Sequence, residues 1–341
     1  MIKVGIIGAT GYIGCELIRI LLSHPHAKIT NLISHSHSGQ PLFEVYPGFS
    51  GCGLPPLEPL SVESLQCDVV FTALPHGTSQ EVIPALVNSG IKVIDMSADY
   101  RYDSAEVYED WYKAAHPFPE LLARSVYGLP ELHKERIKTA LLIGNPGCYT
   151  TCSILALAPL MKRHLIEKDS VIIDAKSGAT GAGRLVSQDM QFCEVNENFK
   201  AYKIASHRHT SEIEQELSKL FGQPVVVSFT PHLLPIGRGI LATCYAKLSE
   251  NAPEQELLEL YKAFYKDAPF VKVGGLPELK HVVGSNYCAI GLTADKRTGR
   301  VVVVSCIDNL IKGAAGQGIQ NMNLLFSKEE TAGLTAPPWQ I

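Results

Sequence analysis

The chain has 341 residues, of which 46% are hydrophobic and 19% are charged. This is ordinary globular composition, and it excludes a collagen-like, coiled-coil or disordered chain. The 30 Lys and Arg against 34 Asp and Glu leave a formal net charge of −4. Because there is no basic excess to hold a phosphate backbone or an anionic membrane, we expect neither nucleic acid nor a membrane as a partner.

No apolar run reaches the roughly 18 residues that a membrane-spanning helix needs, and Gly5 and Gly8 interrupt the apolar run at the N-terminus. We therefore expect a first strand there, no signal peptide, and a cytoplasmic protein. The nine cysteines are odd in number and contain no C-x-x-C pair. This argues against a disulfide framework and a zinc site, so no bound metal is expected.

The first half of the chain alternates short apolar runs with stretches of helical spacing. Strands are predicted over 3–7, 29–33, 69–74 and 91–94. Compact apolar runs that end in Gly, Ser, Pro or His are typical of strands buried on both faces of a parallel sheet. The pattern predicts an α/β fold of the Rossmann type, a doubly wound parallel sheet that binds ligands at the carboxyl ends of its strands.

A glycine-rich turn follows the first predicted strand and precedes a predicted helix. Glycines let the backbone turn tightly and let a pyrophosphate approach the free N–H groups of the helix N-terminus. The glycine spacing departs from G-x-G-x-x-G, and an ordinary βα turn is the alternative. We predict a dinucleotide site formed by Gly8, Thr10, Gly11, Tyr12, Ile13 and Gly14.

The residues after the second predicted strand indicate which dinucleotide is bound. An Asp or Glu there would bond a ribose 2′-hydroxyl and repel a 2′-phosphate. The segment over 34–38 contains no acid, which favours NADP(H) with Ser34, Ser36 and Ser38 as contacts. A solvated polar loop is the alternative. Pro75, which follows the predicted strand over 69–74, is placed in the same cofactor site.

Ser97 and Arg101 follow the predicted strand over 91–94, at the edge where ligands bind. We expect them to hold a phosphate or carboxylate group of a substrate. For Arg101 a surface salt bridge is an almost equal alternative.

A second predicted strand–helix junction carries a candidate nucleophile. The strand over 140–144 leads into Asn145-Pro146-Gly147-Cys148 and then an apolar helix. Asn145 suits an N-cap and Pro146 the first helical position, which places Cys148 in the first turn. There the helix dipole lowers the pKa of a thiol. We predict that Cys148 is the nucleophile, that Asn145 contacts substrate, and that Cys152 is a buried structural residue.

After residue 148 the predicted strands are longer and the helices fewer. Strands are expected over 171–176, 225–230, 240–248 and 301–306. This rhythm predicts a second, α+β domain with a mainly antiparallel sheet, which serves catalysis and oligomerisation. A helix predicted over 309–326 is assigned back to the first domain. The resulting division is 1–146 with 313–341, and 147–312.

A glycine-rich loop follows the predicted strand over 171–176. Its backbone N–H groups suit an anion nest beside a cofactor, although an ordinary turn is the alternative. We place Ser177 and Gly178 in the cofactor site and Arg184 in the substrate site.

A histidine pair is the candidate acid and base. Ser211 and Glu214 have the spacing of a capping box, which places His207 and His209 just before a helix N-terminus. The helix dipole disfavours an imidazolium there, which suits a neutral imidazole that exchanges protons near pH 7. We favour His209 for proton transfer and His207 for substrate contact, and the reverse assignment stays open.

Seven motifs run in order along the chain: GATGYIG, SADYR, NPGCYTT, SGATGAGR, HRHTSEIEQ, PHLLPIGRG and DNLIKGAAGQ. Together they closely resemble the N-acetyl-gamma-glutamyl-phosphate reductases, enzymes of arginine biosynthesis related to aspartate-semialdehyde dehydrogenase. By this resemblance Cys148 matches the catalytic cysteine and His207 and His209 the family's active-site loop. Asn309 resembles the residue that reaches the nicotinamide carboxamide. The arginine that the family often carries near 34–38 is absent.

The resemblance implies reduction of an acyl phosphate by NADPH through a cysteine thioester, giving N-acetylglutamate 5-semialdehyde and phosphate. A homo-oligomer, dimer or tetramer, is expected. An aspartate-semialdehyde dehydrogenase is the close alternative, and an NADP-sensing regulator is the non-enzymatic one. A short-chain reductase is disfavoured, because its Tyr-x-x-x-Lys pair is absent.

Overall fold

The protein is described by a computed structural model that covers residues 1–340. Contacts divide the chain into two units, Met1–Pro146 with Ala314–Thr335 and Gly147–Gly313 with the segment from Ala336 onward. The sequence-based division differs from these units at the C-terminal end, because Trp339 donates its backbone N–H to Val283 O within the second unit.

The first unit contains a seven-stranded sheet in the order β3-β2-β1-β4-β5-β7-β6, with every pairing parallel. This confirms the predicted Rossmann-type sheet. The central strands are buried on both faces, as their unbroken apolar runs require. The strands are β1 (Ile2–Ile7), β2 (Ala27–Ile33), β3 (Leu57–Glu58), β4 (Val69–Thr72), β5 (Lys92–Asp95), β6 (Val126–Tyr127) and β7 (Leu142–Gly144).

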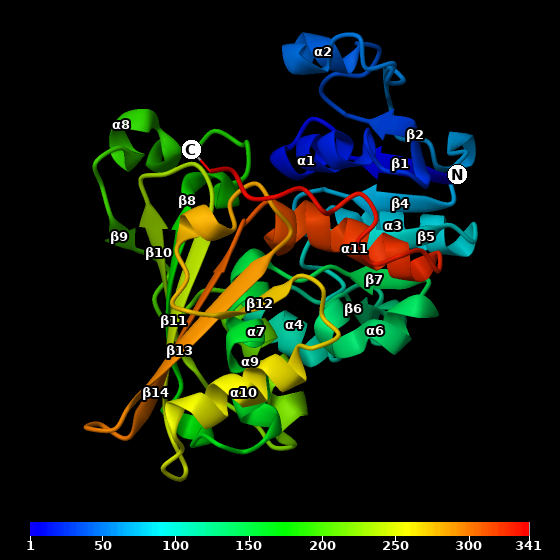
Figure 1. The fold of residues 1–341 in the computed structure, drawn as a ribbon. Coiled ribbons are helices and arrows are strands. Elements are labelled where there is room, and N and C mark those ends of the chain that lie inside the picture. Colours follow the sequence, from blue (N-terminus) through cyan, green and yellow to red (C-terminus); the bar gives the residue numbers. More distant parts are fainter. Residues whose placement is uncertain (341) are drawn as a thin grey trace. The chain divides into compact units, whose positions relative to one another are not determined.

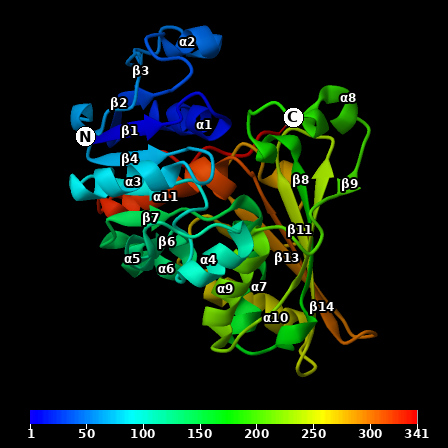
Figure 2. The same cartoon turned by 180° about the vertical axis from the view of Figure 1, so that it is seen from behind.

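The chain leaves β1 in one direction through α1 to β2, and later runs in the opposite direction through α3 from β4 to β5. Right-handed crossovers therefore place α1 and α3 on opposite faces, and the order reverses between β1 and β4 (Figures 1 and 2). The helices are α1 (Tyr12–Leu21), α2 (Leu42–Val45), α3 (Ser79–Asn88), α4 (Ala105–Tyr112), α5 (Pro119–Arg124), α6 (Pro130–Lys138) and α11 (Gly316–Leu325).

Helix α11 returns to the first unit, where it packs against α1, α6 and β5. The helix predicted over 309–326 is shorter in the structure, since a π-helical turn, Ile311–Ala315, precedes α11. Its residues from Gly316 to Leu325 are all buried, including the polar Gln317, Gln320, Asn321 and Asn323.

The second unit contains a mixed seven-stranded sheet in the order β12-β13-β14-β11-β8-β10-β9. The β8–β10 and β12–β13 pairs are parallel and the other four are antiparallel. The strands are β8 (Ile172–Gly178), β9 (Lys200–Ala201), β10 (Ser228–Leu234), β11 (Ile240–Lys247), β12 (Val271–Gly274), β13 (Cys288–Asp295) and β14 (Arg300–Ile307).

The predicted strand over 225–230 is wrong at its start. Val225 and Val227 give their N–H groups to Ser218 Oγ and Glu214 Oε1, so strand pairing begins only at Ser228.

Helices α7 (Cys148–Lys162), α9 (His209–Phe221) and α10 (Glu254–Phe264) are the long helices of the second unit, which also has the short α8 (Phe192–Val195). Helix α7 packs against β11, β14 and α9 and is buried from Tyr149 to Met161 (Figure 1). The opposite face of this sheet carries a cross-strand row, Ile172, Tyr245 and Val302, in which each residue lies directly opposite the next. Ile172 is 40% exposed and the other two are partly exposed.

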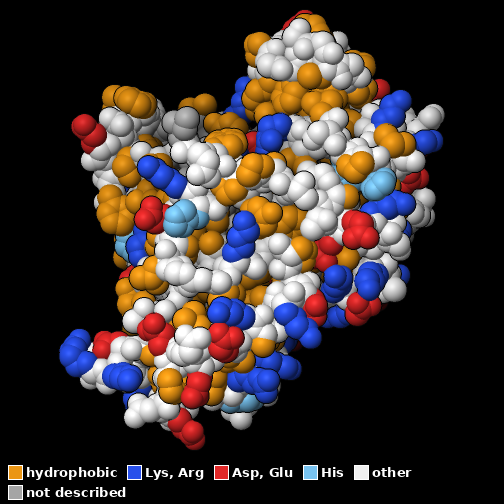
Figure 3. Space-filling view, viewed as in Figure 1, with side chains coloured by type: hydrophobic (Ala, Val, Ile, Leu, Met, Phe, Trp, Pro, Cys, Tyr) orange, Lys and Arg blue, Asp and Glu red, His pale blue; other side chains and the backbone are white. Residues whose placement is uncertain are grey.

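Within residues 1–340, no helix is long and apolar enough to cross a membrane, and no group of three His, Cys, Asp or Glu is placed to hold a metal ion. Acidic and basic side chains are interspersed over the face shown in Figure 3, and apolar side chains gather over α2, where Phe43 is exposed.

Candidate active site

Two glycines of the turn after β1, Gly8 and Gly14, leave no room for a side chain. Gly8 has a φ of +87°, and a Cβ there would run into Ala73 O at the end of β4. A Cβ at Gly14 would run into Gly8 O. Gly11 is the N-cap of α1 and has no side-chain cap, so the first-turn N–H groups of Tyr12, Ile13 and Gly14 face outward without an intrahelical acceptor. This cradle fits a pyrophosphate.

The residues at the end of β2 form a polar and uncharged surface beside this turn. Ser34 is buried, and its Oγ lies 3.1 Å from Thr10 Oγ1. Ser36 and Ser38 are exposed. Tyr46, which sequence analysis missed, donates its hydroxyl to Thr10 O over 2.9 Å.

The loops after β4 and β5 are joined by a buried carboxylate. Asp99 accepts the Gly77 N–H at 2.9 and 3.1 Å and lies 2.6 Å from His76 Nδ1. Pro75, in the same loop, is exposed. Asp99 therefore fixes the loop that contains Pro75 at the carboxyl edge of the sheet.

Ser97 and Arg101 are both buried in the loop after β5, and their role as anion donors stays a prediction. Ser97 donates its hydroxyl to Asp95 Oδ2 over 2.7 Å, and Arg101 donates from Nη2 to Met96 O over 3.2 Å. Burial raises the pKa of Asp95. In this structure both predicted anion donors direct these hydrogen bonds at their own loop.

Asn145 is not the N-cap of α7, which corrects the sequence-based prediction. Its Nδ2 donates to Ala314 O and its Oδ1 accepts from Asn321 Nδ2 at 3.0 Å. The N-cap is Gly147, and α7 begins at Cys148. The predicted position of Cys148 in the first turn is confirmed, although another residue caps the helix.

A buried carboxylate from α9 holds the start of α7. Glu212 is fully buried, and its Oε1 accepts the Gly147 N–H and the Thr150 hydroxyl, each at 2.8 Å. Sequence analysis missed this residue. A signal was present, because Glu212 lies beside the apolar stripe of α9 formed by Ile213 and Leu217.

Two glycines make room around Cys148. A Cβ at Gly147 would collide with the His209 ring, nearest at Nε2. A Cβ at Gly313 would lie 2.7 Å from the Cys148 Cβ. The His209 ring therefore packs against the residue directly before the cysteine, which brings the two predicted catalytic groups into one site.

The histidine pair does not precede a capping box, because α9 already begins at His209. Ser211 donates its hydroxyl to Arg208 O, and Glu214 accepts from Val227. His207 Nδ1 accepts the His209 backbone N–H at 3.2 Å. Burial, and after it the charge of the neighbouring His209, lower the pKa of His207 to about 2. His207 is thus a neutral ring with its proton on Nε2.

Cys152 lies one turn beyond Cys148 but faces the core. Its Sγ donates to Ser305 O over 3.3 Å, and burial raises the pKa of its thiol. A protonated, enclosed thiol is a poor nucleophile, which agrees with its predicted structural role.

The loop after β8 packs against the turn before β11. Thr180 donates its hydroxyl to Gly237 O, and a Cβ at Gly178 would lie 2.7 Å from that oxygen. Ser177 is buried and donates to Gly178 O. Asn309 Oδ1 accepts the Gly239 N–H, and its Nδ2 donates to Thr180. Ser177, Gly178 and Asn309 are therefore together, whereas Arg184 lies on the exposed end of the loop.

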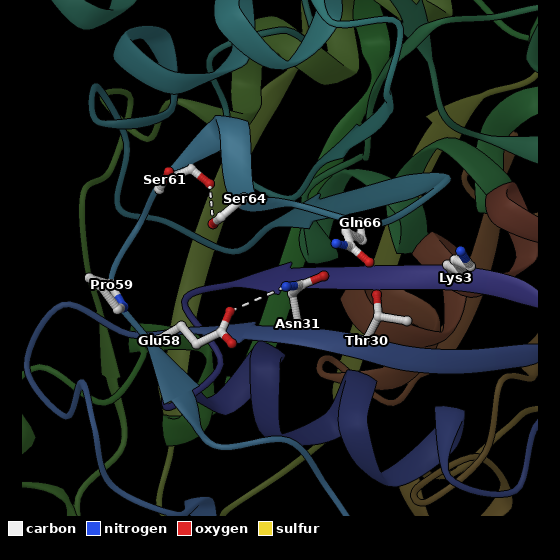
Figure 4. A pocket seen from close by; sticks show the side chains of 8 residues that line it. All are labelled: Lys3, Thr30, Asn31, Glu58, Pro59, Ser61, Ser64 and Gln66. Carbon is white, nitrogen blue, oxygen red and sulfur yellow. Dashed lines mark hydrogen bonds between the residues drawn. The ribbon is translucent and has the colours of Figure 1, made fainter.

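An open pocket of about 470 Å³ lies elsewhere, against β1, β2 and β3 (Figure 4). It contains none of the predicted site residues. Asn31 Nδ2 donates to Glu58 over 3.2 Å, and Ser64 donates to Ser61 O, so several of its polar groups bind one another. It is lined by Lys3, Thr30, Asn31, Glu58, Pro59, Ser61, Ser64 and Gln66.

Comparison with known proteins places the chain among the semialdehyde dehydrogenases. Residues 3–140 match the NAD-binding domain of semialdehyde dehydrogenases, and residues 148–309 match the dimerisation domain of the same enzymes. Aspartate semialdehyde dehydrogenase II of Vibrio cholerae has the same fold, with a TM-score of 0.73 at 17% identity over 96% of this chain and 98% of that one. The enzyme of Candida albicans with NADP has a TM-score of 0.70 at 19% identity, over 97% and 99%.

Closer relatives define the family. The N-acetyl-gamma-glutamyl-phosphate reductase of Acetivibrio thermocellus is 54% identical over 99% of both chains. That of Pelotomaculum thermopropionicum is 51% identical over 98% of both. The chain belongs to the N-acetyl-gamma-glutamyl-phosphate reductase family.

Proposed function

We propose that the protein reduces N-acetyl-gamma-glutamyl phosphate to N-acetylglutamate 5-semialdehyde and phosphate, with NADPH as reductant. The observation that carries the proposal is Cys148 in the first turn of α7, with the His209 ring packed against the preceding glycine. The names of relatives that match nearly the full chain support the substrate.

The chain's residues support covalent catalysis. The α7 dipole stabilises the Cys148 thiolate, which attacks the acyl carbon and expels inorganic phosphate, leaving a thioester. NADPH supplies the hydride that reduces this thioester. His209 donates a proton to the oxyanion formed on the former carbonyl and takes it back as the carbon–sulfur bond breaks. Aldehyde leaves, and the thiolate is restored.

His207 and Glu212 act on this chemistry indirectly. His207 is neutral and accepts the His209 backbone N–H, so it fixes that residue and offers Nε2–H to substrate. Glu212 holds Gly147 and Thr150 and thereby orients the first turn of α7. We propose Arg184, on the exposed loop end, as a substrate contact. We also propose Ser97, Arg101 and Asn145 as substrate contacts.

We propose that the first unit binds the cofactor and prefers NADP(H). Gly8, Thr10, Gly11, Tyr12, Ile13 and Gly14 would hold the pyrophosphate, and Ser34, Ser36 and Ser38 the 2′-phosphate end, where no acid opposes it. Pro75 is proposed as a further contact in the first unit, and Ser177, Gly178 and Asn309 are proposed as cofactor contacts of the second unit. A cytoplasmic location is proposed with this, and the nine cysteines, all free thiols, are consistent with it.

We propose that the chain forms a homo-oligomer, a dimer or tetramer, through the second unit. The matched family model for residues 148–309 describes a dimerisation domain. The exposed row of Ile172, Tyr245 and Val302 is an apolar strip of the kind that a subunit interface covers.

The reverse reaction tests the function. The enzyme is expected to reduce NADP⁺ when given N-acetylglutamate semialdehyde and inorganic phosphate, and to stop when phosphate is omitted. Aspartate semialdehyde serves as the matched control, because the two aldehydes distinguish this family from its structural neighbours. Faster turnover of aspartate semialdehyde, or no phosphate dependence, contradicts the proposal.

A further inference from the structure

The residue before Asn309 is a buried acid that organises the surrounding backbone. Asp308 is fully buried. Its Oδ2 accepts the Gly284 N–H at 2.8 Å, and its Oδ1 accepts the N–H groups of Leu310 at 2.8 Å and Ile311 at 3.1 Å. Asp308 thus fixes the backbone on both sides of Asn309 and ties it to the turn at Gly284.

Arg238 lies on the other side of the same network. Its neighbour Gly239 gives its N–H to Asn309 Oδ1 over 2.8 Å. The Arg238 Nη1 lies 3.6 Å from Asp308 Oδ2, and only 12% of its side chain is exposed. An ion pair of this kind is sensitive to solvent, because water screens the attraction between the two charges. A group that shields Arg238 from water therefore strengthens its ion pair with Asp308 and helps to hold Asn309 in position.

The C-terminal segment provides that cover. The Arg238 guanidinium carbon lies 5.3 Å from the centroid of the Trp339 ring, a cation–π distance. Trp339 also donates its backbone N–H to Val283 O over 2.8 Å. The ring packs on Gly284, where a Cβ would collide with the indole. The Trp339 side chain therefore contacts two of the groups that bind Asp308, the Gly284 turn and Arg238.

We propose that Trp339 is a positioning residue for the cofactor site: it covers the Arg238–Asp308 pair and thereby holds the amide of Asn309 in place for the nicotinamide. The proposal rests on the proposed cofactor role of Asn309. It assigns a function to the segment over 336–340, which follows α11 and belongs to the second unit. Because the ring is half exposed, its removal leaves the core of the unit intact.

The test compares Trp339→Ala with Trp339→Phe, which keeps an aromatic face over Arg238. NADPH binding is measured by fluorescence titration, together with KM and kcat. We expect Trp339→Ala to raise both the Kd and the KM for NADPH about three- to tenfold, with kcat changed less than twofold. The phenylalanine variant should stay within about twofold of wild type. If Trp339 only stabilised the fold, both variants would have a lower melting temperature, and the KM for NADPH would not rise while kcat stayed constant.

The decisive control is the double variant. If Trp339 acts through Asn309, Trp339→Ala has no further effect on the NADPH Kd in an Asn309→Ala background. Additive effects, an unchanged Kd in Trp339→Ala, or an unchanged Kd in Asn309→Ala overturn the proposal. The NADPH Kd values of the variants could follow the expected pattern while the wild-type protein fails to turn over N-acetylglutamate semialdehyde. That result would contradict the proposed function and leave the role of Trp339 intact.

Discussion

Cys148 and Cys152 are four residues apart on one helix, yet their surroundings differ. Cys148 lies at the positive end of the α7 dipole, whereas the Cys152 thiol is enclosed in the core with a raised pKa. We expect Cys148→Ala to abolish turnover and to leave the Kd for NADPH within about twofold. Cys152→Ala is the matched control and should keep most activity. More than about 1% activity in Cys148→Ala would exclude it as nucleophile, because that loss normally spans several orders of magnitude.

His207 and His209 should respond differently to pH. The pKa of His207 is lowered to about 2 by burial, so protonating this ring is unfavourable and it stays neutral through the neutral range. His209→Asn is expected to lower kcat by about 10²- to 10⁴-fold and to remove a limb of the pH–rate profile. His207→Asn should mainly raise the substrate KM and keep the profile. The opposite pattern in rates measured from pH 5 to 9 would reverse the two roles.

Ser34 is the position at which cofactor choice is most easily changed. Ser34 is buried beside Thr10. A carboxylate at this position would repel the 2′-phosphate, and the neighbouring Thr10 has no positive charge that would offset the repulsion. We expect Ser34→Asp to lower kcat/KM for NADPH at least about tenfold and to narrow or reverse the preference over NADH. The matched control is Ser34→Asn, because Asn has the size of Asp but no charge. This variant should keep the preference for NADPH over NADH. Equal kcat/KM for both cofactors in wild type would contradict the basis of this prediction.

At the scale of elements, α7 depends on a group supplied by α9. The Glu212 carboxylate accepts the Gly147 N–H and the Thr150 hydroxyl at the helix start. Glu212→Ala removes the acceptor of the buried Gly147 N–H, whereas the Thr150 hydroxyl can still donate to Gly147 O. We expect this loss to cost about 1–3 kcal/mol of stability and to slow alkylation of Cys148. Glu212→Gln keeps an amide oxygen and should recover most of both. Melting curves and iodoacetamide labelling measure the two effects, and equal behaviour of the two variants would argue against a hydrogen-bonding role.

Some helix and strand boundaries could be predicted from the sequence, and others could not. The strands over 3–7 and 29–33 were predictable because local apolar runs determine burial on both faces. The start of α9 was not, since Ser211 and Glu214 have the local spacing of a cap but bond Arg208 and Val227 instead. Glu212 reaches Gly147 across 65 positions. Such a contact depends on the packing of α7 on α9, which no local pattern contains.

The candidate site divides in the same way. Cys148, His209 and the glycine turn were identified because short motifs contain the residues that this chemistry needs. The structure explains why Gly8, Gly14 and Gly147 are glycines, since a Cβ at each position would collide with a neighbouring group. The hydrogen bonds that Ser97 and Arg101 donate to Asp95 and Met96 were not predictable from the sequence, and their contact with a ligand stays a prediction. Residue type alone does not show which way a side chain points.

At the scale of the whole molecule, the outward face of the second sheet predicts association. Tyr245 lies in the middle of the exposed row, opposite Ile172 and Val302. A charge there would have to be desolvated in an interface, so Tyr245→Glu is expected to shift the protein toward monomer in light scattering. Tyr245→Phe should not. Unchanged circular dichroism would show that the sheet still forms, and an unchanged mass for Tyr245→Glu would place the interface elsewhere.

The order in which the two units are completed along the chain bears on synthesis. The strands of the first unit are all made by residue 146, but α11, which packs on α1, α6 and β5, comes after the 167 residues of Gly147–Gly313. At ~5–20 residues per second, the ribosome needs roughly 8–33 s to make that insertion. During this interval the nascent sheet lacks the helix that packs against β5, where Lys92 donates its ammonium group to Leu325 O of α11. The newly made N-terminal half therefore leaves this face of its sheet uncovered until α11 has been synthesised.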